Sequence, residues 1–149
     1  MAKDAERRWE RAAGVASLGA ASVHGGLAPA HFDAWWGYGA FFLLAAAAQA
    51  VLGLALLVDP FDPARLRIPV ERARRRMRVA GALGQAALVA LYAVSRVRGV
   101  PFAGPARGVV EPVAPLDLVA KALEVACAAI LAVLLLREPF SSALRLRGA

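Results

Sequence analysis

The chain has 149 residues, of which 60% are apolar and 19% are charged, and its mean hydropathy is +0.56. Soluble domains are nearer ~45–50% apolar and ~25% charged, so this composition excludes a disordered chain and most soluble folds and favours a chain dissolved in lipid. The single cysteine excludes an internal disulfide and a cysteine-based zinc site. We expect one domain, residues 1–149, with room for membrane-spanning helices of ~20 residues.

Apolar segments of the required length occur at about residues 12–30, 37–58, 79–97 and 117–136. The last of them contains Lys121 and Glu124 in its first half. The alternating pattern of a barrel strand does not occur in the sequence, so helices are the expected spanning elements. Because short connections make consecutive helices antiparallel, the sequence predicts an all-α, up-down-up-down four-helix bundle in the membrane.

Basic residues predict the orientation of this bundle. Fourteen of the eighteen Lys and Arg residues lie before residue 12, in the connection 59–78, or after residue 136. Short cytoplasmic loops retain positive charge, so both termini and this connection are predicted to be cytoplasmic. The connection lacks the stacking aromatics of a nucleic-acid site, and we expect the lipid bilayer, not nucleic acid, as its partner.

Ionisable side chains gather near the predicted outer end. Asp117, Lys121 and Glu124 form a stripe on the fourth helix, and the spacing of Asp117 and Lys121 favours an ion pair between them. At ~1.5 Å per residue, Glu124 and His24 lie at similar depths of about 10 Å, so they can meet if the first and fourth helices are neighbours. Such groups usually face a bundle interior, a cavity or one another.

His31 and Glu111 extend this polar set outside the predicted spans. His24 and His31 share a helix face only if the first helix continues through Pro29. Histidines with carboxylates would suit a transition metal such as copper, iron or zinc, although no established metal motif occurs. The simpler alternative for His24 is an interhelical hydrogen bond. The candidate ligand or metal residues are therefore His24, His31, Glu111, Asp117 and Glu124.

Three further polar residues are expected to be structural. Gln49 and Gln85 have comparable predicted depths, ~18–20 Å below the outer boundary, so we expect a hydrogen bond between them. Lys121 is expected to neutralise Asp117. The connection 96–116 is rich in Gly and Pro, and it either folds over the mouth of the bundle or simply connects two helices.

Several spaced motifs resemble an uncharacterised family of small four-span membrane proteins of high-GC bacteria. They are His24, Pro29-Ala-His-Phe, Tyr38-Gly-Ala-Phe-Phe leading to Gln49, Gly99-Val-Pro-Phe, and Glu111-Pro-Val followed by Asp117 and Glu124. The resemblance covers about residues 15–135 and implies the fold and a bacterial cytoplasmic membrane, but no activity. Members often have Glu where this chain has Ala30, which weakens a carboxylate-rich metal site at His31.

The sequence thus predicts a non-catalytic membrane protein with an outward-facing polar pocket. The pocket would bind a metal ion or small ligand, or the protein would act as an accessory subunit with a membrane protein partner or as a homo-oligomer. The alternative is a small proton-coupled transporter that uses His24 and Glu124. A membrane enzyme is a third hypothesis, because these groups support acid–base chemistry, but no nucleophile stands out.

Overall fold

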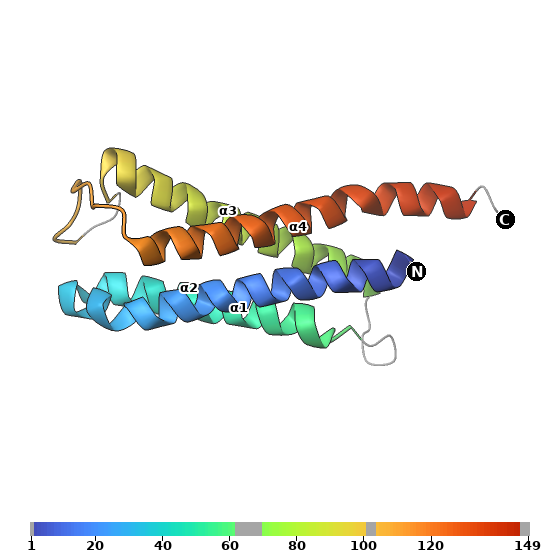
Figure 1. Cartoon of the computed structure of the whole chain (residues 1–149), viewed down its shortest axis with the longest axis horizontal. Coiled ribbons are helices and arrows are strands. Elements are labelled where there is room, and N and C mark those ends of the chain that lie inside the picture. Colours follow the sequence, from blue (N-terminus) through green and yellow to red (C-terminus); the bar gives the residue numbers. More distant parts are fainter. Residues whose placement is uncertain (1, 62–69, 101–103, 147–149) are drawn as a thin grey trace.

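The computed structural model of the chain describes residues 2–61, 70–100 and 104–146, and these residues form an all-α fold. Its four helices are α1 (Ala2–Ala34), α2 (Trp36–Val58), α3 (Val70–Arg98) and α4 (Pro115–Leu146). The helices lie along the long axis of the molecule, and the start of α1 and the end of α4 lie at the same end (Figure 1). We call the opposite end, which carries residues 104–114, the loop end.

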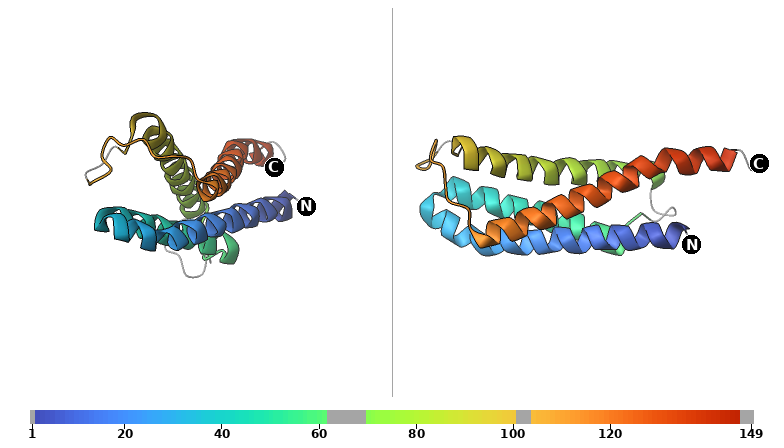
Figure 2. Two further views of the ribbon diagram at one scale, coloured as in Figure 1. Left: turned by 60° about the vertical axis from the view of Figure 1, so that its left-hand side comes forward. Right: turned by 45° about the horizontal axis from the view of Figure 1, so that its top comes forward.

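The helices pack unevenly around the axis. Helix α1 packs against α2 and α4, and α4 packs against α3. Helices α2 and α3 meet near mid-length, where Leu52 lies against Gly81. Towards the loop end α3 diverges from α1 and α2, as two further views show (Figure 2). The interior is therefore close-packed at mid-length and opens towards the loop end.

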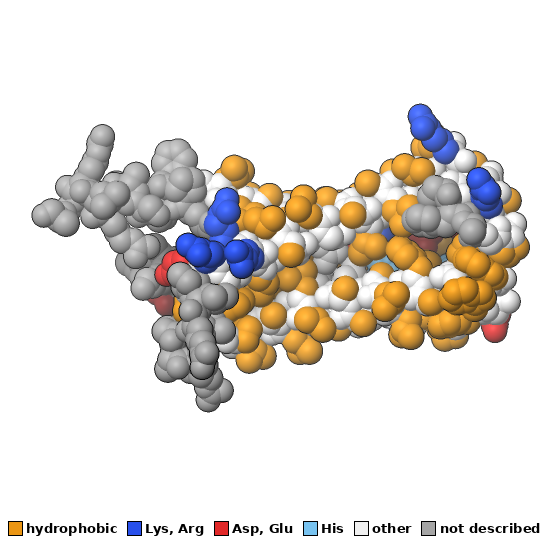
Figure 3. Space-filling view, turned by 180° about the vertical axis from the view of Figure 1, so that it is seen from behind, with side chains coloured by type: hydrophobic (Ala, Val, Ile, Leu, Met, Phe, Trp, Pro, Cys, Tyr) orange, Lys and Arg blue, Asp and Glu red, His pale blue; other side chains and the backbone are white. Residues whose placement is uncertain are grey.

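Three helices are long and apolar enough to cross a membrane, namely α2, α3 and residues Pro115–Arg137 of α4. Within the described chain α1 is not among them, because glycines, serines and His24 interrupt the apolar residues of the predicted span 12–30. Large apolar side chains point outward, and Leu44, Val51 and Leu136 are each about 70% exposed. The visible face is hydrophobic between charged ends (Figure 3), as expected for a surface solvated by lipid.

Most of the helices extend beyond the predicted spans. Helix α1 continues through Pro29 to Ala34, so His24 and His31 lie on one helix. Helix α3 begins at Val70 instead of about residue 79, since the arginine-rich segment before the span is itself helical. Arg65 and Arg67, which belong to the predicted cytoplasmic connection, lie outside the described residues.

Ion pairs explain why this arginine-rich segment packs as a helix. Arg78 is 2% exposed and donates to Glu10 at 2.7 Å and also to Glu6. Arg74 donates to Asp59 at 2.8 Å. A buried guanidinium is tolerated where carboxylates pair with it. Arginines that we interpreted as a topology signal therefore also join α3 to α1 and to the end of α2.

Helices α1 and α2 approach each other closely at two glycines. A Cβ atom on Gly14 would lie 2.9 Å from the Gly53 carbonyl oxygen, and a Cβ atom on Gly53 would lie 2.8 Å from the Gly14 carbonyl oxygen. Neither distance is compatible with a side chain at the present separation. Small residues thus set the distance between the helices, as is usual in membranes.

We expect Gly14→Ala to destabilise the protein by ~1–3 kcal/mol, because the added methyl group forces the two backbones apart. Gly26→Ala on the same helix is the matched control, since a Cβ atom there meets nothing within 4 Å. That control should be neutral or stabilising, by up to ~1 kcal/mol. Unfolding in detergent, followed by circular dichroism, measures the difference, and equal stabilities of the two variants would contradict the close contact.

Candidate functional site

A chain of buried polar side chains connects all four helices. Ser17 and His24 come from α1, Gln49 from α2, Gln85 from α3 and Glu124 from α4. Each is at most 4% exposed. The predicted hydrogen bond is present, with Gln49 Nε2 donating to Gln85 Oε1 at 2.9 Å. We call these five residues the polar network.

Backbone oxygens fix the direction of every hydrogen bond in this network. The Gln49 carbonyl oxygen can only accept, so Ser17 Oγ donates to it at 2.7 Å and accepts from Gln85 Nε2 at 3.2 Å. Gln85 then presents Oε1 to Gln49 Nε2, and Gln49 presents Oε1 to His24 Nδ1 at 2.9 Å. The Ala20 carbonyl oxygen also faces Nδ1, at 3.1 Å. These acceptors assign a hydrogen atom to His24 Nδ1.

The other ring nitrogen of His24 faces a carboxylate. His24 Nε2 lies 3.5 Å from Glu124 Oε1, so the two residues meet as the depth argument predicted. Gln49 Nε2 donates to the same oxygen at 3.2 Å, and Lys121 Nζ donates to Glu124 Oε2 at 2.6 Å. Glu124 is fully buried, and these donors compensate the charge of its carboxylate.

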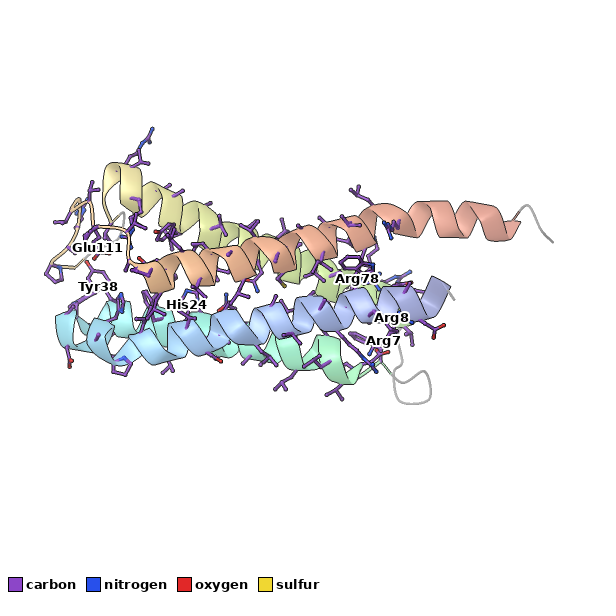
Figure 4. All side chains as sticks on the ribbon, viewed as in Figure 1. Arg7, Arg8, His24, Tyr38, Arg78 and Glu111 are labelled. Atoms are coloured by element: carbon purple, nitrogen blue, oxygen red, sulfur yellow. The ribbon has the colours of Figure 1, made fainter. Side chains whose placement is uncertain are left out.

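A cavity of about 290 Å³ lies between this network and the loop end. All four helices line it, and His24 and Lys121 belong to its wall. Figure 4 places Tyr38 and Glu111 at the loop end, His24 further towards the middle, and Arg78 near the opposite end. The cavity therefore occupies the space that opens where α3 diverges from α2.

Arg96 organises the acidic residues around this cavity. It donates to Glu111 at 2.9 Å and to Asp117 at 2.6 Å. Our expectation that Lys121 neutralises Asp117 is therefore wrong. Lys121 reaches Glu124 one turn further on, and the branched guanidinium of Arg96 from α3 contacts both Asp117 and Glu111. An i, i+4 spacing predicts that two groups on one helix can meet. It does not predict whether a side chain from another helix competes for one of them.

The connection after α3 folds back over the cavity. The backbone N–H of Ala106 donates to Tyr38 Oη at 3.1 Å, and Glu111 bonds to Arg96. Gly104 packs so closely on Tyr38 that a Cβ atom would lie 2.6 Å from its Oη. Of the two alternatives for this segment, the cover over the mouth is the one that these contacts support.

The candidate metal residues do not gather around one point. His31 stacks on Phe42, with ring centroids 3.6 Å apart, and its Nδ1 donates to the Leu27 carbonyl oxygen at 2.9 Å. Glu111 and Asp117 bind Arg96, as described above. Among the described residues, no group of three or more His, Cys, Asp or Glu side chains could hold a metal ion. The described residues therefore give no support for a copper, iron or zinc site.

Tyr92 is a site residue that our sequence reasoning missed. Lys121 Nζ lies 5.4 Å and Arg96 Cζ 4.7 Å from the centre of its ring, so two cations contact one aromatic side chain. The available signal was the i, i+4 spacing of Tyr92 and Arg96, which puts both on one face of α3. The partner on α4 could not be read from that spacing.

Comparison with known proteins finds no matching family model, no matching curated protein and no matching solved structure. The resemblance to a family of bacterial four-span proteins therefore stays a prediction.

Gln49→Leu tests the polar network. The substitution leaves Gln85 Oε1 without its donor and removes one acceptor of His24, so we expect a loss of ~1–3 kcal/mol in unfolding free energy. Ser22→Ala is the control, because that hydroxyl is exposed and bonds only to the Leu18 carbonyl oxygen of its own helix. Its effect should stay within ~0.5 kcal/mol. A Gln49→Leu protein as stable as the parent in detergent would refute the network's role.

Proposed function

We propose that this chain is a non-catalytic, multi-pass protein of a bacterial cytoplasmic membrane that binds a small ligand in its cavity. In this proposal the helices form an up-down-up-down bundle with both termini in the cytoplasm, and the loop end faces outward. The single observation that supports ligand binding is the 290 Å³ cavity with ionisable groups in its wall. Ligand pockets of membrane bundles lie between helices in this way.

The basic residues support the proposed orientation, and the charges in the cavity support a binding function. The start of α1, the end of α4 and the arginine-rich start of α3 lie together, away from the loop end, and positive segments are retained in the cytoplasm. Charged side chains within a membrane cost free energy, and those that face a cavity usually serve binding or transport. An accessory role with a membrane protein partner or as a homo-oligomer is compatible with this binding function.

Cysteine labelling tests both the cavity and its orientation. In a Cys127→Ala background, Leu88→Cys places a thiol in the cavity wall, and Ala87→Cys places one on the exposed surface of the same helix at similar depth. A membrane-impermeant thiol reagent should modify Leu88→Cys in right-side-out vesicles and leave Ala87→Cys unmodified. Reaction only in inverted vesicles would reverse the orientation, and equal reaction of both variants would rule out a water-accessible cavity.

A second candidate function is proton-coupled transport, favoured by the hydrogen-bond directions around His24. Because Nδ1 carries a hydrogen atom, a neutral ring would turn the lone pair of Nε2 towards Glu124 Oε1, 3.5 Å away. The two atoms are thus placed so that a proton can pass between them in this second function. His24 lines the cavity, which would give this proton a path to the ligand.

Proton flux in proteoliposomes tests this second function. With a pH-sensitive dye inside and a pH gradient imposed, Glu124→Gln should reduce the flux to that of empty liposomes, because the pair can no longer exchange its proton. Glu71→Gln is the matched control, since Glu71 is exposed at the start of α3, and its flux should equal that of the parent. Undiminished flux in Glu124→Gln, or no flux in the parent, would exclude the carrier function.

A further inference from the structure

The inner end of the cavity presents a positive charge. Lys121 lines the cavity with 14% of its side chain exposed, whereas its partner Glu124 is fully buried and does not line it. The ammonium group has three N–H donors, of which Glu124 accepts one at 2.6 Å. A molecule that enters the cavity therefore meets the ammonium group and not the carboxylate behind it.

Further hydrogen-bond donors lie beside Lys121, around Tyr92. Tyr92 Oη and Arg96 Nε are both buried. The Arg96 guanidinium lies near the Tyr92 hydroxyl, but neither atom makes a hydrogen bond of ordinary geometry within the described residues. A buried donor without an acceptor is unfavourable. An acceptor group that a ligand brings to this point would satisfy these donors and face two cations at once.

The carboxylates at the mouth are already neutralised. Arg96 donates to Glu111 at 2.9 Å and to Asp117 at 2.6 Å, so a cationic ligand would have to displace a guanidinium from two carboxylates. Lys121 is paired with Glu124, but its ammonium group keeps two further N–H donors, so an anion can bind there without displacing that carboxylate. The inner end of the cavity at Lys121 therefore favours an anionic head group over a cationic one, while Arg96, Glu111 and Asp117 compensate one another at the mouth.

Much of the remaining wall is apolar, although His31, Tyr38 and Ser95 also line it. It includes Leu27, Phe41, Phe42, Leu88 and Leu91. The volume of about 290 Å³ is at the small end of the ~300–1,000 Å³ typical of ligand pockets. This shape fits a ligand with one polar head and a short apolar body, and such molecules concentrate in membranes.

We propose that the cavity binds an amphipathic monocarboxylate of the fatty-acid class. Its carboxylate lies against Lys121 and the Tyr92 hydroxyl, and its chain lies among the leucines and phenylalanines of the wall. This inference rests on the proposed ligand-binding function of the cavity and specifies the chemistry of the ligand.

Trp35 lines the cavity and serves as the reporter of binding. With Trp9→Phe and Trp36→Phe in the full-length protein, Trp35 is the only tryptophan left. Decanoate that carries bromine at its chain end should quench Trp35 saturably in lipid nanodiscs, because bromine quenches on contact. Unlabelled decanoate should displace it, whereas decanol and decyltrimethylammonium should do so at least tenfold less effectively.

Variants assign the carboxylate to Lys121. Lys121→Met combined with Glu124→Gln removes both charges together, so no unpaired charge is left in the interior, and saturable quenching should weaken at least tenfold. Glu124→Gln alone should bind at least as tightly as the parent, because the ammonium group has lost its internal partner. Arg98→Met, an exposed cation at the same end of α3, is the control and should leave binding unchanged.

The outcomes separate this inference from the function on which it rests. If decyltrimethylammonium displaces the bromine-labelled probe better than decanoate, the cavity binds ligands but the monocarboxylate is wrong. Undiminished binding in the Lys121→Met and Glu124→Gln double variant overturns the site at Lys121 in the same way. If no probe quenches Trp35 saturably in the parent, while Leu88→Cys is labelled, the cavity is open but the ligand class is wrong.

Discussion

The polar network of Ser17, His24, Gln49, Gln85 and Glu124 is the interaction on which the arrangement of the helices depends. Apolar faces do not select one neighbour over another in lipid, because lipid tails are as apolar as leucine. Glycine contacts such as Gly14 with Gly53 set how near two helices come. Hydrogen bonds that join all four helices in one connected network set their rotation and register, since a turn of any helix would leave buried partners unsatisfied.

The cavity is a consequence of where this network ends. On the side of the network away from the loop end, Gly81 leaves room for Leu52 to fill the space between α2 and α3, and the interior is closed there. Towards the loop end α3 diverges from α2, and Arg96 joins α3 instead to Asp117 on α4 and to Glu111 in the covering segment. The cavity thus lies where α2 and α3 no longer pack against each other and where ion pairs connect α3 to its neighbours.

The sequence predicts the parts of this arrangement that depend on depth along a single helix. The meeting of Gln49 with Gln85 and of His24 with Glu124 follows from the rise per residue and from the order of the helices. The partner of Lys121 was predicted wrongly, because that choice depends on where the Arg96 side chain reaches from another helix. Helix ends were missed for a related reason, since ion pairs between α1 and α3 extend α3 beyond its apolar span.

The charged residues of the network have a role beyond joining the helices. Ser17, Gln49 and Gln85 are neutral, and they alone would join α1, α2 and α3 through hydrogen bonds. Glu124 adds a fully buried carboxylate and Lys121 a half-buried ammonium group, and a buried ion pair is often no more stable than well-packed apolar residues in its place. Stability therefore does not explain the pair. Its position does, because the pair joins the network to the wall of the cavity and places an ammonium group at the inner end, in addition to the charged groups at the mouth.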